Sequence, residues 1–170
     1  IKTFNESIYI PRLLDEDDVE SQTKVTEADL VTNHKTNNVK IIHGVAGTGK
    51  SHVLSSLSKL AKKTHPDFWV SFFDLKQFAN DFEEISKSKK PETQTFNEIV
   101  SKTLLKLYNF EARFFEEMFN RGKVMIFFDG FDEISPNYKE IMTKVLQRFE
   151  SSSELWITTR SHLKDELRSC

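Results

Sequence analysis

A glycine-rich segment that ends in a lysine and a serine is the part of the sequence best suited to bind an anion. Its residues are Gly44, Val45, Ala46, Gly47, Thr48, Gly49, Lys50 and Ser51. They fit the pattern G-x-x-x-x-G-K-[ST] in full, in which glycines let backbone N–H groups turn inward around phosphate oxygens. The lysine adds a positive charge near the β- and γ-phosphates, and the serine hydroxyl completes the shell of a magnesium ion. The segment therefore predicts a site for a nucleoside triphosphate with Mg²⁺.

A group of acidic residues follows an apolar segment later in the chain. Asp129 comes directly after Val124–Phe128, and Asp132 and Glu133 follow in the same short loop. A phosphate-binding loop needs an acid at the end of a neighbouring strand to hold magnesium, so we predict that Asp129 is the second magnesium ligand. Asp132 or Glu133 could orient a water for attack on the γ-phosphate and act as the base. The alternative for these two acids is an ordinary solvated turn before the next helix.

A third polar group closes the last apolar segment. Thr158 and Thr159 offer hydroxyl groups there, and Arg160 adds a fixed positive charge. The carboxyl edge of a parallel sheet faces the ligand in folds of this kind, so we predict that Arg160 senses the γ-phosphate. An arginine after a strand is otherwise often a surface charge.

Four apolar segments of strand length position these groups. They are Val39–His43, Trp69–Leu75, Val124–Phe128 and Leu155–Thr158. The first is rich in β-branched residues and runs straight into the glycine-rich segment, and the third is an uninterrupted apolar run, as in central parallel strands covered on both faces. Because the motif lies directly after a strand, a chance glycine turn is only a minor alternative for it.

Helical patterns separate the strands. Lys50–Thr64 has apolar residues at the helical period directly after the motif. The other helical patterns are the stretch with Phe78, Phe82 and Ile85, the repeat from Phe96 to Leu107, Glu111–Arg121 before Gly122, Asn137–Phe149, and Ser161–Leu167. The Lys- and Ser-rich segment Ser86–Pro91 is predicted to be a mobile loop. Strands alternating with helices predict an α/β fold of three layers, α/β/α, with a mainly parallel sheet.

Residues 1–38 are predicted to lead into a single domain that spans 39–170. Ser7–Leu14 has the pattern of a short extended segment that contains Pro11, and the acidic run Asp15–Glu20 is predicted to be a solvated turn. Thr26 is a candidate N-cap for a short helix that reaches Val31. With 170 residues and 38% hydrophobic content, the chain is long enough for one domain with a real core.

Composition excludes several classes of partner. The formal net charge is −2, and the basic stretch Lys87–Lys90 is short, so we expect no binding to nucleic acid. The only cysteine is Cys170, which excludes a disulfide framework and favours a reducing compartment. The histidines lack metal-ligand spacing. No apolar run approaches the roughly 20 residues that cross a bilayer, so a soluble cytoplasmic protein is expected.

The three motifs GVAGTGKS, VMIFFDGFDEI and LWITTR together resemble the NACHT family of signal-transducing NTPases, within the wider STAND group. The most discriminating part is Asp129–Glu133, where a small residue follows the strand acid and an acid pair lies downstream. The resemblance implies a parallel sheet in which the Thr158 strand lies between the Ile41 and Phe127 strands, with the Phe72 strand beyond. It also implies ATP or GTP with Mg²⁺ as ligands, and the context of an intracellular innate-immune-type receptor.

The same resemblance extends the predicted nucleotide site beyond the motif. The segment Ile8–Arg12 is similar to the lead-in that lies by the base in such proteins, so Pro11 and Arg12 are predicted nucleotide contacts. We also include His52, the residue after Ser51, in the nucleotide-binding set. Family members usually continue into a helical and a winged-helix domain, so the NACHT-like domain at 39–170 is expected to be a truncated part of a larger protein.

The leading functional hypothesis is a slow regulatory NTPase, in which the bound nucleotide biases conformation and self-association. The motif N-K-x-D for guanine is absent from the sequence, which favours ATP over GTP. A non-hydrolysing scaffold is the main alternative, with a contact face at Phe114, Phe115, Met118 and Phe119, although such a helical stripe is more often core. A phosphotransferase ranks lower, because the segment Ser86–Arg121 offers only lysines and Arg113 for a phosphate-clamping lid.

Overall fold

A computed structural model describes residues 13–15, 24–32, 38–87, 98–134, 138–149 and 153–168. Some of the sequence predictions lie outside these residues. They are the nucleotide contacts Pro11 and Arg12, most of the extended segment 7–14 and of the acidic run 15–20, residues 88–91 of the predicted loop, Phe96, Asn137 and Cys170.

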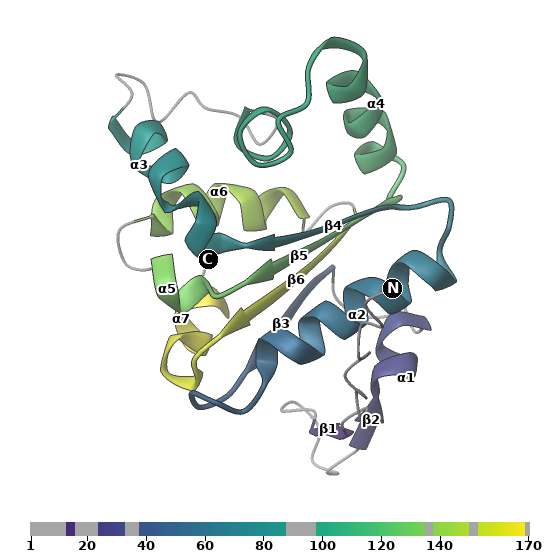
Figure 1. Ribbon diagram of the computed structural model, residues 1–170, viewed down its shortest axis with the longest axis vertical. Helices are drawn as coiled ribbons and strands as arrows, with labels where there is room; N and C mark the ends of the chain where they lie inside the picture. Colours follow the sequence, from purple (N-terminus) through teal and green to yellow (C-terminus); the bar gives the residue numbers. More distant parts are fainter. Residues whose placement is uncertain are drawn as a thin grey trace, which may run out of the picture.

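A parallel sheet of four strands forms the centre of the described structure (Figure 1). Its strands are β3 (Val39–His43), β4 (Trp69–Asp74), β5 (Val124–Asp129) and β6 (Glu154–Thr159). They lie in the order β3-β6-β5-β4, and each neighbouring pair is parallel. This confirms the predicted α/β class and the strand order that the family resemblance implies.

Helices cover both faces of the sheet, which gives the three predicted layers (Figure 1). One face carries α1 (Glu27–Thr32) and α2 (Lys50–Thr64). The other carries the 3₁₀ helix η1 (Leu75–Phe78), α3 (Ala79–Lys87), the π-helix η3 (Glu98–Leu104), α4 (Asn109–Asn120) and α6 (Lys139–Phe149). Short helices follow β5 and β6, namely α5 (Phe131–Ile134), η4 (Ser161–Leu163) and α7 (Lys164–Arg168).

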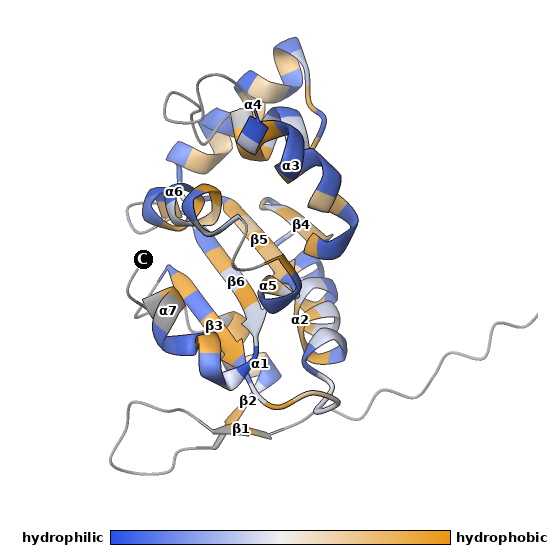
Figure 2. Ribbon diagram, turned by 90° about the vertical axis from the view of Figure 1, so that its left-hand side faces the viewer, coloured by the Kyte–Doolittle hydropathy of each residue, from blue (hydrophilic) through white to orange (hydrophobic). Residues whose placement is uncertain are grey.

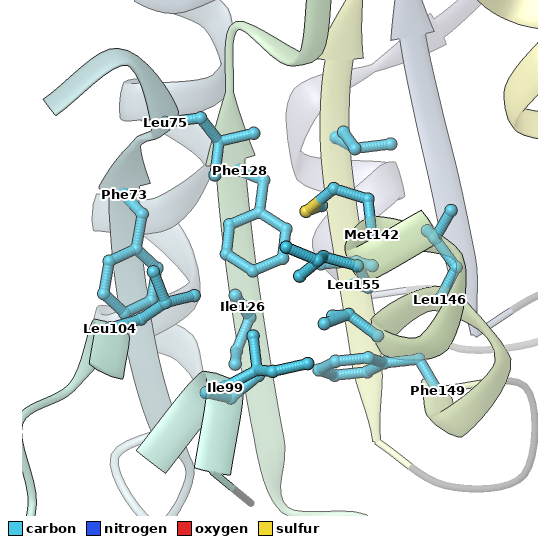
Figure 3. Close-up of a cluster of buried hydrophobic side chains, with 14 of the residues drawn as sticks. Phe73, Leu75, Ile99, Leu104, Ile126, Phe128, Met142, Leu146, Phe149 and Leu155 are labelled. Carbon is cyan, nitrogen blue, oxygen red and sulfur yellow. The ribbon is translucent and has the colours of Figure 1, made fainter. Parts of the chain in front are cut away.

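The central strands β5 and β6 are apolar on both sides, and alternate residues enter two separate cores. Ile126 and Phe128 face one cluster, whereas Met125 and Phe127 join the cluster under α2. Figure 3 shows Ile126 and Phe128 among side chains from η3 and α6. Burying one phenylalanine fully contributes about 1.5–3 kcal/mol. In Figure 2 the strands are mainly hydrophobic and α3 is mainly hydrophilic, as this packing requires.

Cross-strand contacts fix β6 between β3 and β5. The Trp156 ring stacks on Phe127 of β5, with centroids 5.8 Å apart, and the Lys40 ammonium of β3 lies 4.5 Å from the Trp156 ring centroid. Lys40 Nζ also lies 2.6 Å from Glu154 Oε2 in an ion pair that is largely buried. Because these contacts cross all three strands, they favour one register over its neighbours.

The end of β4 is one residue earlier than predicted. Leu75 begins η1 instead of ending the strand, because the Asp74 side chain accepts a hydrogen bond of 3.2 Å from the Lys76 N–H and caps the new helix. The predicted loop at Ser86 also begins later, since Ser86 and Lys87 are the last residues of α3.

The helical repeat predicted between residues 96 and 107 is a π-helix at Glu98–Leu104, and residues 105–107 are described but not helical. The Leu105 N–H donates to the Val100 carbonyl at 2.9 Å, a bond between residues five apart. The wider turn lets Ile99, Val100 and Leu104 all enter the core, although they are spaced by four and five residues.

The apolar residues of α4, one alternative for a protein contact face, are divided between core and surface. Phe115 and Phe119 are 0% and 1% exposed, so they belong to the core, while Phe114 is 43% exposed. Exposed aromatic residues continue at the start of the helix with Phe110, which stacks on Phe114 at a centroid distance of 6.2 Å. Gly122 follows the helix with φ +69°, which confirms it as the stop signal.

The lead-in contains a two-stranded antiparallel sheet that the sequence patterns did not predict. It pairs β1 (Leu13–Asp15) with β2 (Lys24–Thr26). The predicted cap of α1 is confirmed, because the Asp29 N–H donates to Thr26 Oγ1 and the Thr26 N–H donates to Asp29 Oδ2, each at 3.2 Å. Among the helices described, none is long and apolar enough to cross a bilayer.

Candidate functional site

The glycine-rich loop joins the carboxyl end of β3 to the start of α2 (Figure 1). Gly47 and Gly49 have φ values of +79° and +81°, which side-chain-bearing residues rarely adopt. Gly44 is needed for a different reason, since a Cβ atom there would lie 3.1 Å from Thr48 Oγ1. The loop is therefore a tight turn that favours glycine at Gly47 and Gly49.

The ammonium group of Lys50 is hydrogen-bonded to this loop. Its Nζ donates to the Gly44 carbonyl at 3.0 Å and to the Val45 carbonyl at 3.1 Å, and Thr48 Oγ1 donates to the same Val45 carbonyl at 2.9 Å. Ser51 is exposed one residue further along. The first turn of α2 has no acidic residue and no side-chain cap, so its backbone N–H groups and positive helix end remain suited to an anion.

Asp129 ends β5 and is held by a residue of β6. Thr158 Oγ1 donates to Asp129 Oδ1 at 2.5 Å and accepts a hydrogen bond of 2.8 Å from the Gly130 N–H. In the described structure the other oxygen, Asp129 Oδ2, makes no hydrogen bond or ion pair. A carboxylate with one oxygen fixed and the other open is well suited to hold a hard cation.

The two further acids each meet a basic side chain. Arg160 Nε lies 2.8 Å from Asp132 Oδ2, with side-chain exposures of 53% for the arginine and 11% for the aspartate. Lys76 Nζ lies 3.5 Å from Glu133 Oε2, and this pair is largely exposed. Both acids are in α5, directly after Gly130, whose φ of +81° turns the chain away from the sheet.

The parallel sheet brings most of the predicted residues to one edge. Because β6 lies between β3 and β5, the loop, Asp129 and Arg160 all lie at the carboxyl ends of adjacent strands. His52 lies in the first turn of α2 and is exposed, so its place in the nucleotide set stays a prediction. Pro11 and Arg12 are outside the described residues.

Two residues of this edge were not assigned their partners from the sequence. Thr158 was noted only as a hydroxyl, and its contact with Asp129 joins residues far apart in the chain. Lys76 carries no motif that would mark it as a partner of Glu133. The register between neighbouring strands was the missing information in both cases, because strand order alone does not fix which side chains meet.

The donors at this edge fit magnesium held together with a nucleotide. Within the described parts of the chain, no three His, Cys, Asp or Glu residues gather into a metal site. Magnesium does not need such a cage, because it usually takes one or two protein oxygens together with phosphate oxygens and water. In such an arrangement Ser51 Oγ and Asp129 Oδ2 would supply protein oxygens.

Two solved structures share the fold at low sequence identity. Domain III of the replication initiation protein DnaA from Thermotoga maritima is 18% identical, with a TM-score of 0.50, over 78% of this chain and 48% of that chain. PCH-2 from C. elegans is 16% identical, with a TM-score of 0.50, over 84% of this chain and 37% of that chain. The match thus spans less than half of either structure, and at this identity it concerns the fold alone.

Sequence comparison identifies the family. No curated protein matches the chain significantly. The family model of the NACHT domain matches residues 38–170, which include the glycine-rich loop, Asp129, the acid pair and Arg160. The chain therefore belongs to the NACHT domain family of nucleotide-binding P-loop NTPases.

Proposed function

We propose that this chain is a regulatory domain that binds ATP with Mg²⁺ and hydrolyses it slowly. The observation that carries the proposal is the meeting of the phosphate-binding loop, Asp129 and Arg160 at one edge of the sheet. ATP is favoured over GTP because the sequence has no N-K-x-D motif. The nucleotide state would act as a conformational switch for self-association in cytoplasmic, innate-immune-type signalling, by a domain at residues 39–170 preceded by a lead-in at 1–38.

Each residue of the site has a distinct role in this proposal. The loop N–H groups and Lys50 bind the phosphates, with further contacts from His52, Pro11 and Arg12. Ser51 and Asp129 hold the metal, which neutralises charge on the β- and γ-phosphates when bound. Arg160 moves from Asp132 to the γ-phosphate and stabilises the charge that develops there.

Glu133 is the better candidate for the base that orients the attacking water. A Cβ atom at Gly130 would lie 3.5 Å from Glu133 Cδ, so this carboxyl group lies back over the residue that follows Asp129. Its ion pair with Lys76 is long and exposed, which leaves it free to accept a proton from water. Asp132 is instead the resting partner of Arg160.

The test is nucleotide binding by calorimetry and phosphate release over hours for three variants. Lys50→Ala should abolish ATP binding, because it removes the charge at the phosphates. Glu133→Gln should keep ATP affinity within about twofold and lower hydrolysis by about 10²–10⁴-fold, the usual contribution of a general base. Lys62→Ala, an exposed lysine at the other end of α2, should change neither. Equal ATP affinity in Lys50→Ala and wild type would refute the proposed site.

A scaffold that binds nucleotide without hydrolysis is the second candidate. It is favoured by the ion pair between Arg160 and Asp132. While they are paired, Arg160 does not contact a γ-phosphate and Asp132 does not accept a proton from water. The same measurements separate the two candidates. Lysine-dependent binding with no phosphate release by wild type would select the scaffold, whereas slow release that Glu133→Gln lowers would select the NTPase.

A further inference from the structure

The hydroxyl of Thr158 lies at the point where backbone pairing between β5 and β6 ends. Phe128 and Ile157 are the last residues paired between these strands. Beyond this pair, the Gly130 N–H donates to the side chain of Thr158, the residue after Ile157, instead of to a backbone carbonyl, at 2.8 Å. The hydroxyl therefore continues the attachment of β5 to β6 up to the site.

The chemistry of the groups fixes the direction of both hydrogen bonds. A backbone N–H can only donate, and an ionised carboxylate can only accept. Thr158 Oγ1 must therefore accept a hydrogen bond from the Gly130 N–H and donate one to Asp129 Oδ1, at 2.5 Å. Thr158 is 1% exposed, so water does not compete for these bonds. The Asp129 carboxylate is thus held in one orientation, with Oδ2 left open.

We propose that Thr158 is a positioning residue for the magnesium site, which presents Asp129 Oδ2 to the metal by holding Oδ1. The inference rests on the proposed function, since it assigns a role toward the metal of that same nucleotide site. Partners that orient a metal ligand typically contribute 10- to 100-fold to metal affinity. Losing the hydroxyl should therefore change the Mg²⁺ concentration that ATP binding requires more than it changes ATP affinity in the absence of Mg²⁺.

The neighbouring threonine provides a matched control. Thr159 is 0% exposed, and its Oγ1 has no hydrogen-bond partner among the described residues. Replacing either threonine by valine removes one buried hydroxyl and keeps the shape of the side chain. Only Thr158→Val leaves the Gly130 N–H and Asp129 Oδ1 without their partner.

The experiment measures ATP affinity against Mg²⁺ concentration for wild type, Thr158→Val, Thr158→Ser and Thr159→Val. Thr158→Val should raise the Mg²⁺ concentration for half-maximal tightening of ATP binding by about 10- to 100-fold. ATP affinity without Mg²⁺ should stay within about twofold of wild type, because the loop and Lys50 are untouched. Thr158→Ser should restore the wild-type requirement, since serine keeps the hydroxyl, and Thr159→Val should leave it unchanged.

Several outcomes would overturn the inference. If wild type shows Mg²⁺-dependent ATP binding and Thr158→Val needs the same Mg²⁺, the inference fails and the proposed function stands. If wild type binds no ATP, both fail. If Thr158→Val does not fold, Thr158→Cys replaces it, because the thiol is a much weaker donor. An unchanged Mg²⁺ requirement in that variant would refute the role of the hydroxyl.

Discussion

At the scale of single residues, two basic side chains of the site have partners within the protein. The Lys50 ammonium binds two loop carbonyls, and Arg160 pairs with Asp132. Both cations have the partners that a phosphate would replace. In the proposed site, nucleotide binding would therefore exchange these partners, and its free energy would be the difference between the phosphate contacts and the internal ones.

If Arg160 exchanges Asp132 for the γ-phosphate, Asp132 should affect the ratio of ATP affinity to ADP affinity. Asp132→Asn should raise the ratio of ATP to ADP affinity by up to about fivefold, because an ion pair whose arginine is 53% exposed contributes about 0–1 kcal/mol. Only ATP offers a γ-phosphate to the released Arg160. Calorimetric titration with both nucleotides would measure this ratio.

The control for this prediction is Asp165→Asn, an exposed acid on α7. It should leave the ratio unchanged, whereas Arg160→Ala should lower it. A ratio that stays at the wild-type value in both Asp132→Asn and Arg160→Ala would show that Asp132 does not compete with the γ-phosphate for Arg160.

At the scale of helices and strands, two neighbouring phenylalanines of α4 should contribute very differently to the free energy of unfolding. Phe115→Ala should lower the free energy of unfolding by about 3–5 kcal/mol, because the side chain is fully buried. Phe114→Ala should lower it much less, since that side chain is 43% exposed. Urea denaturation of both variants would measure the difference, and equal losses would contradict the assignment of α4 faces.

Elements with a strong local pattern could be predicted from the sequence. The segment Val39–His43 and the helix Lys50–Thr64 have the predicted bounds, because an apolar run, a glycine turn and a helical period follow one another. The π-helix at Glu98–Leu104 could not be distinguished from an α-helix, because Val100 and Leu104 are four residues apart and also fit the α-helical spacing.

Contacts between elements were less accessible to sequence patterns. The loop motif identified Lys50, and the strand end identified Asp129, because each signal is local. The bond from Thr158 to Asp129 depends on strand order and register, which the chain sets through packing far from the site, such as the stack of Trp156 on Phe127. The family resemblance implied the strand order, whereas the bond between Thr158 and Asp129 is apparent only from the structure.

At the scale of the whole molecule, nucleotide should stabilise the folded state. A ligand present at 100 times its Kd adds about 2.7 kcal/mol, and a domain of this size gains about 2–4 °C in Tm for each kcal/mol. We therefore expect ATP with Mg²⁺ to raise Tm by roughly 5–10 °C, with a smaller rise for ATP without Mg²⁺. A thermal-shift titration would measure both.

The variant for this test is Lys50→Ala, which should show no rise in Tm at the same ATP and Mg²⁺ concentrations. A rise as large as that of wild type would mean that the stabilising ligand binds elsewhere on the molecule. GTP in parallel would test the preference for adenine, since a weaker ligand gives a smaller rise.

The position of β6 has a consequence for biosynthesis. The strand is made last among the four, yet it lies between β3 and β5, which do not pair with each other. A nascent chain that ends before Glu154 already carries Ser51 and Asp129 but lacks the strand that aligns them. Domains generally fold as units while the chain emerges from the ribosome. In the proposed site, a nascent chain would therefore bind nucleotide only after β6 has been synthesised and has inserted between β3 and β5.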